Sequence, residues 1–430
     1  MAFPAFLEPF GRWCRRDLVA FLKWILLSLP VGSIVGVVGA LFAHGLTWVT
    51  QFREAHFWML YLLPAAGLAI VGIYHLLDMD NDGGTEFILA SVRDARHLHF
   101  RMLPLIFVST LLTHLTGGSA GREGAALQIG GSIGHNLGRL LRLDDRDERV
   151  ITMAGMAAGF SALFGTPIGA AVFAMEVVSV GVMYYSAIVP CFLSALIAKL
   201  VARWLGVPAA AFVLQGPPDL TPLSLVQLLG LGALCALAAV LFCQGMRLTG
   251  IYYGKLTQNR WIRVLLGGVL VVALTLLLGT TDYNGAGMDV LTRAVEGRAV
   301  PVAFLLKILF TAITLRAGYK GGEIVPTFFV GATFGCVVGP LLGLNPSFAA
   351  AAGMVAVFCG VTNCPLTSLL LGYELFAGAG LAPMVLTIAT SYMLSGYCGL
   401  YHEQLIMFSK TKSLFIHQNA GEEYTRETLD

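Results

Sequence analysis

The most constraining feature of this chain is a series of apolar stretches that follow one another along almost all of its 430 residues. Hydrophobic residues account for 57% of the chain and charged residues for 12%, whereas a soluble domain has roughly 25% charged residues. Lipid is therefore the expected solvent, and the sequence predicts an all-α polytopic membrane protein. The stretches lie at roughly 18–50, 57–77, 102–117, 124–141, 150–163, 166–205, 223–248, 262–279, 301–317, 324–343, 348–361, 365–378 and 381–400.

Basic residues predict the orientation of the chain. The segment from Arg12 to Lys23 leads into the first apolar stretch, and Lys410 and Lys412 follow the last one. Because cytoplasmic loops are enriched in Lys and Arg, both termini are expected in the cytoplasm, with an even number of crossings of the cell membrane. The first stretch is too long for a cleavable signal peptide. A formal net charge of +2 without a basic cluster indicates no nucleic-acid partner.

The chain contains an internal repeat with an offset of about 200 residues. The turn 121–123 (Gly-Arg-Glu) matches 321–323 (Gly-Gly-Glu), and 157–167 matches 355–365, each ending in proline. Several stretches are shorter than the ~20 residues of a perpendicular span, as in the interrupted helices of transporters, whose binding sites lie between repeats. The predicted organisation is a cytoplasmic segment 1–17, a first repeat 18–205, a linker 206–222, a second repeat 223–405 and a short cytoplasmic tail 406–430.

Two glutamates occupy equivalent positions in the two repeats. Glu176 follows Pro167 by nine residues, and Glu374 follows Pro365 by nine residues. Each lies late in an apolar helix, where a lone carboxylate costs about 2.5–3.5 kcal/mol at the bilayer centre. We therefore expect each glutamate to bind backbone groups of the other repeat rather than to carry protons.

Glu123 follows Gly121-Arg122 and directly precedes an apolar run that begins at Ala125. A helix that starts here presents unpaired N–H groups and the positive end of its dipole, which favour an anion. A carboxylate at that place can compete with the anion and, when protonated, move away, which combines a gate with a proton carrier. The alternative is a simple helix cap. Glu323, which precedes Pro326, is interpreted either as a residue that takes part in proton or anion coupling or as a helix cap.

Two further residues offer hydroxyl groups. Thr85 precedes a short helix, where it can donate to an anion or cap the helix. Tyr401 follows the last apolar stretch, where it can donate to an anion or belong to the aromatic belt at the membrane surface. His402-Glu403 lacks the second histidine of a zinc-protease motif, and the sequence has no ATP-binding phosphate loop. No metal site and no cofactor are expected.

Together these residues resemble the CLC family of anion channels and anion/proton antiporters. The segment 121–124 (Gly-Arg-Glu-Gly) is similar to the family motif G(K/R)EGP, 321–326 is similar to GGxFxP, and Tyr401 takes the place of the family's anion-site tyrosine. The resemblance implies two inverted-topology repeats of tilted and interrupted helices, in a homodimer with one pore per subunit. It also implies that Glu123 is the gating glutamate. The anion-binding residues that it implies are Thr85, Tyr401, Gly124 and the backbone N–H groups around Ile324 and Val325.

The chain departs from the family pattern at several positions. Ala125 replaces the proline of GREGP, and residues 85–88 replace the Ser-Gly-Ile-Pro of GSGIP. Val177 stands where proton-coupled chloride exchangers have an inner glutamate, so the usual inner proton path is in doubt. Glu323 stands where chloride members have an apolar residue. This is similar to the fluoride-exporting branch, although that branch typically has threonine where this chain has Val325.

We therefore expect a transporter that exchanges a halide, chloride or fluoride, for protons, with Glu123 as the proton carrier. Fluoride holds its water tightly, so its site needs strong donors, and a protonated Glu323 is such a donor. The alternative within the family is a passive chloride channel, favoured by Val177. A membrane enzyme or a non-transporting receptor has less support, because the carboxylates are not paired with a nucleophile, a base or a metal cluster. The expected partners are halide anions, protons, the lipid bilayer and a second copy of the chain.

Overall fold

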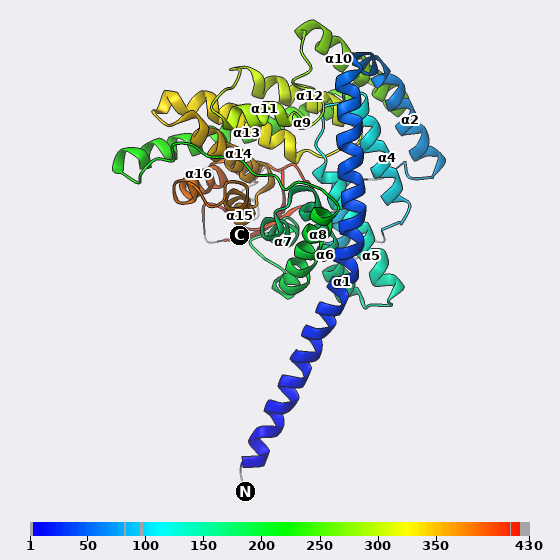
Figure 1. Cartoon of the computed structure of the whole chain (residues 1–430), viewed down its shortest axis with the longest axis vertical. Coiled ribbons are helices and arrows are strands. Elements are labelled where there is room, and N and C mark those ends of the chain that lie inside the picture. Colours follow the sequence, from blue (N-terminus) through cyan, green and yellow to red (C-terminus); the bar gives the residue numbers. More distant parts are fainter. Residues whose placement is uncertain (1–2, 81–82, 95–97, 413, 422–430) are drawn as a thin grey trace.

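The computed structural model describes residues 3–80, 83–94, 98–412 and 414–421, with side chains from Arg16 onward, so part of the predicted tail, 422–430, lies outside the described residues. Helices dominate the described chain (Figure 1). The elements are α1 (Phe3–Ala55), η1 (Phe57–Leu62), α2 (Leu63–Leu76), α3 (Thr85–Asp94), α4 (Met102–Leu115), α5 (Glu123–Leu140), α6 (Asp145–Phe164), α7 (Pro167–Glu176), β1 (Ser179–Val180), η2 (Tyr185–Ala187), α8 (Ile188–Trp204), α9 (Pro222–Leu256), α10 (Arg260–Leu278), α11 (Met288–Val295), α12 (Ala303–Ala317), α13 (Ile324–Val338), η3 (Gly339–Leu342), α14 (Pro346–Thr362), α15 (Pro365–Leu375), α16 (Leu381–Leu394), β2 (Leu405–Phe408) and β3 (Phe415–Asn419).

The described chain contains six helical segments that are long and apolar enough to cross a membrane, by their length and composition. One of them is Arg16–Ala55 of α1, which extends along the height of the body, while the N-terminal part of α1 projects beyond it (Figure 1). Shorter apolar helices complete the body, and α14 is buried along almost its whole length. The prediction of an all-α polytopic membrane protein with interrupted helices is confirmed.

The internal repeat is visible as two equivalent helix pairs, α5 with α6 and α13 with α14. In each pair the backbones of the two helices touch. A methyl group on Gly130 of α5 would collide with the carbonyl of Gly155 of α6, and one on Gly331 of α13 would collide with the carbonyl of Gly353 of α14. Small residues at such crossings let transmembrane helices approach closely, so the glycine spacing in each repeat sets the helix packing.

Each of the two equivalent glutamates caps the N-terminal end of a helix in the other repeat. Both carboxylate oxygens of Glu176, at the end of α7, accept hydrogen bonds at the start of α15, from Leu366 N (3.1 Å), Thr367 N (2.8 Å) and Thr367 Oγ1 (2.6 Å). Glu374, near the end of α15, accepts from Ile168 N (3.1 Å) and Gly169 N (2.8 Å) at the start of α7. Helix N-termini favour a carboxylate. The prediction that these glutamates bind the backbone of the other repeat is confirmed.

This exchange of caps predicts a stability effect. Replacing Glu176 by alanine leaves the donors of Leu366 and Thr367 without their acceptor, and a buried donor left unsatisfied costs about 1–3 kcal/mol. We expect a lower melting temperature in detergent, whereas Glu54→Ala, at an exposed glutamate, should leave it unchanged. A variant that melts like the wild type but has lost proton transport would instead make Glu176 a proton carrier.

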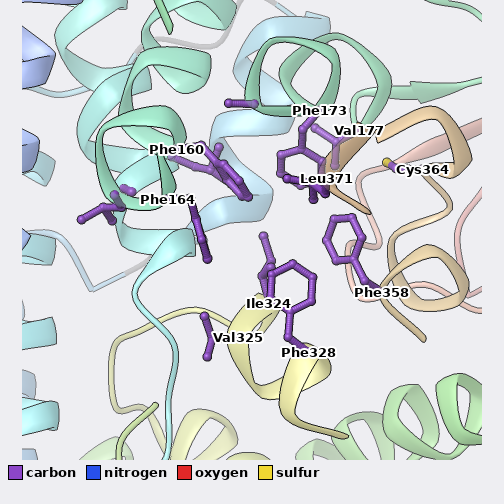
Figure 2. Close-up of a cluster of buried hydrophobic side chains, with 14 of the residues drawn as sticks. Phe160, Phe164, Phe173, Val177, Ile324, Val325, Phe328, Phe358, Cys364 and Leu371 are labelled. Carbon is purple, nitrogen blue, oxygen red and sulfur yellow. The ribbon is translucent and has the colours of Figure 1, made fainter. Parts of the chain in front are cut away.

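The core at the repeat interface is a closed group of five phenylalanine rings (Figure 2). Phe160 and Phe164 come from α6, Phe173 from α7, Phe328 from α13 and Phe358 from α14. Neighbouring rings around the group have centroids 4.8–6.0 Å apart. Because both repeats contribute rings, this cluster excludes water from their interface and holds the starts of the interrupted helices in place.

A small three-stranded sheet, which was not predicted from the sequence, includes the two strands that follow the last helix. β1 pairs in parallel with β2, and β2 pairs antiparallel with β3. Beyond the last helix, Lys410 is largely buried and donates to Asn363 Oδ1 (2.5 Å), Tyr392 O (3.0 Å) and Ser395 Oγ (3.3 Å). Burial lowers the pKa of Lys410 to about 8. The residues that follow α16 are therefore packed onto the helical body.

Candidate functional site

Two glycine turns, one from each repeat, meet back to back. Gly121 and Gly322 form an antiparallel bridge in which each N–H donates to the other carbonyl, at 2.7 and 2.8 Å. A methyl group on Gly322 would lie 2.5 Å from the backbone nitrogen of Gly124, so only glycine fits there. The bridge brings the N-terminal ends of α5 and α13 together, and both helix ends offer unpaired N–H groups.

Glu123, the first residue of α5, is 0% exposed and reaches across to the other repeat. Its Oε2 accepts from Val325 N (3.2 Å) at the start of α13 and from Arg122 N (3.0 Å). Its Oε1 has no hydrogen-bond partner among the described residues and lies 3.8 Å from Arg122 Nε. The carboxylate thus occupies the place that an anion bound to α13 would take, rather than only capping its own helix.

Glu323 is the N-cap residue of α13, yet its side chain makes no capping hydrogen bond. The side chain is partly exposed, and Arg316 attracts it while Glu86 and Glu123 repel it. Glu323 therefore belongs to a group of three carboxylates around the start of α13, and its geometry lends no support to the simple cap. When protonated, it is a donor close to the helix end that Glu123 occupies.

Thr85, the first residue of α3, is buried and faces the start of α5. A side chain on Gly124 would lie 2.9 Å from Thr85 Oγ1, so the glycine leaves space beside the hydroxyl. Gln128, one turn further along α5, donates from Nε2 to Thr85 Oγ1 (3.2 Å). Since that oxygen accepts from Gln128, its own proton can point elsewhere, toward an anion. Sequence reasoning missed Gln128, although a lone amide in the apolar run after Ala125 was a usable signal.

The contact of Gln128 with Thr85 predicts a loss of transport. Gln128→Leu keeps the approximate volume and removes the donor, and a net hydrogen-bond contribution of about 0.5–1.5 kcal/mol corresponds to a roughly 2- to 12-fold slower anion flux. Asn136→Leu is the matched control, because Asn136 is also an amide on α5 but donates to Ser132 O (2.7 Å), away from Thr85. Equal losses in the two variants would assign the effect to the helix rather than to the hydroxyl.

Tyr401 lies between α16 and β2 and is 2% exposed, which excludes the aromatic belt at the membrane surface. Its hydroxyl has no hydrogen-bond partner among the described residues, and Glu323, Glu123 and Glu86 lie within its electrostatic range. Gln404 fixes the segment after it by donating to the carbonyls of Val177 (3.0 Å) and Thr362 (2.7 Å). The Tyr401 hydroxyl is thus buried, without a hydrogen-bond partner among the described residues, and within electrostatic range of these three carboxylates.

The remaining predicted positions are apolar. The side chains of Ile324 and Val325 lie in the phenylalanine cluster (Figure 2), so these residues offer only their backbone to the site. Val177 is also buried in that cluster and carries no titratable group. The structure therefore brings Glu123 into contact with Val325 and places Thr85 beside Gly124, with Tyr401 within electrostatic range of Glu123. At the position of the usual inner proton path the chain has Val177 and no carboxylate.

A cavity of about 420 Å³ lies beside the C-terminal end of α1 and reaches Arg122, the residue before Glu123. Arg53, His114 and Arg122 line it together with Asn284, which donates to Gly117 O (2.7 Å) and so holds the loop before Glu123. Three carboxylates, Glu54, Asp282 and Asp289, line the same cavity, so its described lining carries charges of both signs. Within the described part of the chain, no group of three or more His, Cys, Asp or Glu residues is arranged to hold a metal ion.

Known proteins are similar to this chain along most of its length. A family model described as "Voltage gated chloride channel" matches residues 78–396. A Pseudomonas syringae pv. tomato protein named "Chloride/fluoride channel protein" is 35% identical over 94% of this chain and 91% of its own length. A Vibrio vulnificus protein named "H(+)/Cl(-) exchange transporter ClcA" is 27% identical over 87% of each. A crystal structure described as a CLC-type fluoride/proton antiporter superposes with a TM-score of 0.87 at 31% identity, covering 90% of this chain and 98% of that one.

Proposed function

The chain belongs to the voltage-gated chloride channel (CLC) family, and from that premise we propose that it exchanges halide anions for protons, with Glu123 as gate and proton carrier. It is a multi-pass integral protein of the cell membrane. Transport, rather than an enzymatic reaction, is the activity that its family implies. By analogy with the family, we also propose that it works as a homodimer in which each subunit has its own pore.

One observation carries the proposal: the Glu123 carboxylate accepts the N–H of Val325 at the start of the other repeat's helix. An ionised carboxylate and a halide cannot both occupy that donor. Protonation removes the charge that holds the side chain there, so the anion can enter as the proton moves away. Competition for one donor therefore links the two fluxes in opposite directions, which is the requirement for exchange.

Fluoride is the halide that we favour as substrate. The relative from Pseudomonas syringae is named a chloride/fluoride channel protein, and the superposing crystal structure is described as a fluoride/proton antiporter. Fluoride loses strong hydration on binding, so it needs donors that a larger chloride ion does without. Glu323, when protonated, adds such a donor beside the N–H of Val325. Val325 itself contributes no hydroxyl, so the site depends more heavily on Glu323.

A passive channel is the second candidate, because Val177 provides no proton acceptor on the inner side. The test is flux from purified protein in liposomes that contain chloride or fluoride, with a pH-sensitive dye to follow protons. Exchange predicts that a gradient of the transported halide drives protons uphill. Anion efflux that leaves the proton gradient unchanged would make the protein a channel, and no anion flux at all would exclude both.

A further inference from the structure

A second site is indicated by a cavity of about 340 Å³ between α2, the start of α10 and the loop after α12. Its wall contains the basic side chains Arg260, Arg263 and Lys320 and the acidic side chain Asp80. An adjoining cavity of about 420 Å³ shares Val71, Asp80 and Arg260 with it. The lining residues are distinct from those that surround Glu123.

Among the described residues that line this cavity, three are cationic and one is a carboxylate. Arg260 donates to the backbone of Asp80 and lies 3.4 Å from its Oδ1, and Asp80 also pairs with His75 (2.8 Å). Arg263 Nε donates to Ala317 O at the end of α12 (3.4 Å). Lys320 Nζ lies 4.2 Å from the centre of the Tyr74 ring. Arg260 and Arg263 are neighbours at the N-terminal end of α10, where like charges repel and a nearby anion is favoured.

The orientation that the basic residues predict places this cavity at the cytoplasmic boundary of the membrane. In this orientation α1 starts in the cytoplasm and crosses, and α2 returns, so the C-terminal end of α2 faces the inner side. That end packs against the start of α10, where a methyl group on Gly72 would lie 3.4 Å from the ring of Trp261. Trp261 is 41% exposed at this level, as expected of an interfacial aromatic residue. Further along α10, Leu265 and Leu266 are also exposed. A ligand bound here would therefore contact cationic side chains at one end of the cavity and apolar side chains at the other.

We propose that this cavity binds the phosphate head group of an anionic phospholipid of the inner leaflet. Basic pockets between transmembrane helices on the cytoplasmic side bind such head groups. Arg263 and Lys320 hold the phosphate oxygens, and an acyl chain lies along Ile70 and Val71 of α2, which line the same cavity. A soluble phosphate ion shares the oxyanion but leaves this apolar wall uncovered, so the lipid is the better fit.

The test is a titration of the purified full-length protein with dioleoyl-phosphatidylglycerol, in which native mass spectrometry counts the bound lipid. Each basic side chain near a membrane surface contributes about 1 kcal/mol, which is about fivefold, so the double variant Arg263→Gln, Lys320→Gln should bind about 30-fold more weakly. Lys255→Gln is the matched control, because Lys255 is exposed near the end of α9, on the same inner surface, and does not line the cavity.

The outcomes distinguish a specific lipid-binding site from nonspecific electrostatic attraction of anionic lipid to the protein surface. Weaker lipid binding in the double variant, with wild-type binding in Lys255→Gln, supports the site. Equal weakening in both would assign the effect to surface charge and overturn it. Wild-type binding of dioleoyl-phosphatidylcholine that matches that of phosphatidylglycerol, or displacement of the lipid by an equal concentration of inorganic phosphate, would also overturn it. If the double variant does not fold, Lys320→Gln alone gives the same comparison, with an expected loss of about fivefold.

Discussion

Replacing Glu123 by glutamine is expected to reduce proton transport to the level of protein-free liposomes while halide still crosses the membrane. Glutamine has nearly the shape of the protonated carboxyl group but cannot release a proton. It also lacks the charge that favours the bond to Val325 N, so the anion competes more successfully for this donor. The variant therefore separates the two fluxes that the wild type couples.

The measurement is halide efflux and proton uptake from the same liposomes. Glu54→Gln is the control. Glu54 is also a glutamate and lines the cavity beside the C-terminal end of α1, but it pairs with Arg53 (3.4 Å) and does not reach α13. Proton transport that persists in Glu123→Gln would remove Glu123 as the carrier. A variant in which both fluxes stop would show that the charge is needed to open the path.

Replacing Glu323 by alanine is expected to slow fluoride transport much more than chloride transport. The Glu323 side chain makes no capping hydrogen bond, so the substitution removes no cap from α13. A hydrogen bond to a charged group contributes about 1.5–3 kcal/mol, which corresponds to a roughly 10- to 150-fold loss for fluoride. Chloride, which is less strongly hydrated, should lose much less.

The comparison uses initial rates for the two halides in the same preparation. Glu86→Ala is the control, since Glu86 is a nearby carboxylate within electrostatic range of Glu323 but does not precede α13. Adding Val325→Thr to Glu323→Ala places a hydroxyl at the start of α13 and should restore part of the fluoride rate. Equal losses for both halides in Glu323→Ala would identify a structural residue and remove the argument for fluoride.

The hydroxyl groups show where local sequence stops being informative. Thr85 as an N-cap and Thr85 as an anion ligand have the same local pattern, and the contact that distinguishes them comes from Gln128 on α5. Tyr401 likewise follows an apolar stretch, as belt residues do, yet it is buried. For Thr85 the deciding neighbour is distant in the chain, and for Tyr401 the deciding observation is burial within the folded protein. The two-residue strand β1 is another example, because its partner β2 lies more than 200 residues further on.

The lipid environment, the internal repeat and the exchanged caps could all be assigned from the residues alone. Hydrophobic periodicity and length depend only on local residues, and a repeat offset is read by aligning the chain with itself, so Glu176 and Glu374 could be assigned from their equal distance to proline. The bond of Glu123 to Val325, the contact of Gln128 with Thr85 and the cavity that Arg263 and Lys320 share become visible only in the folded protein. The physical reason is that a hydrogen bond or a cavity exists only where distant segments meet within a few ångströms, and that meeting depends on the packing of all the helices together.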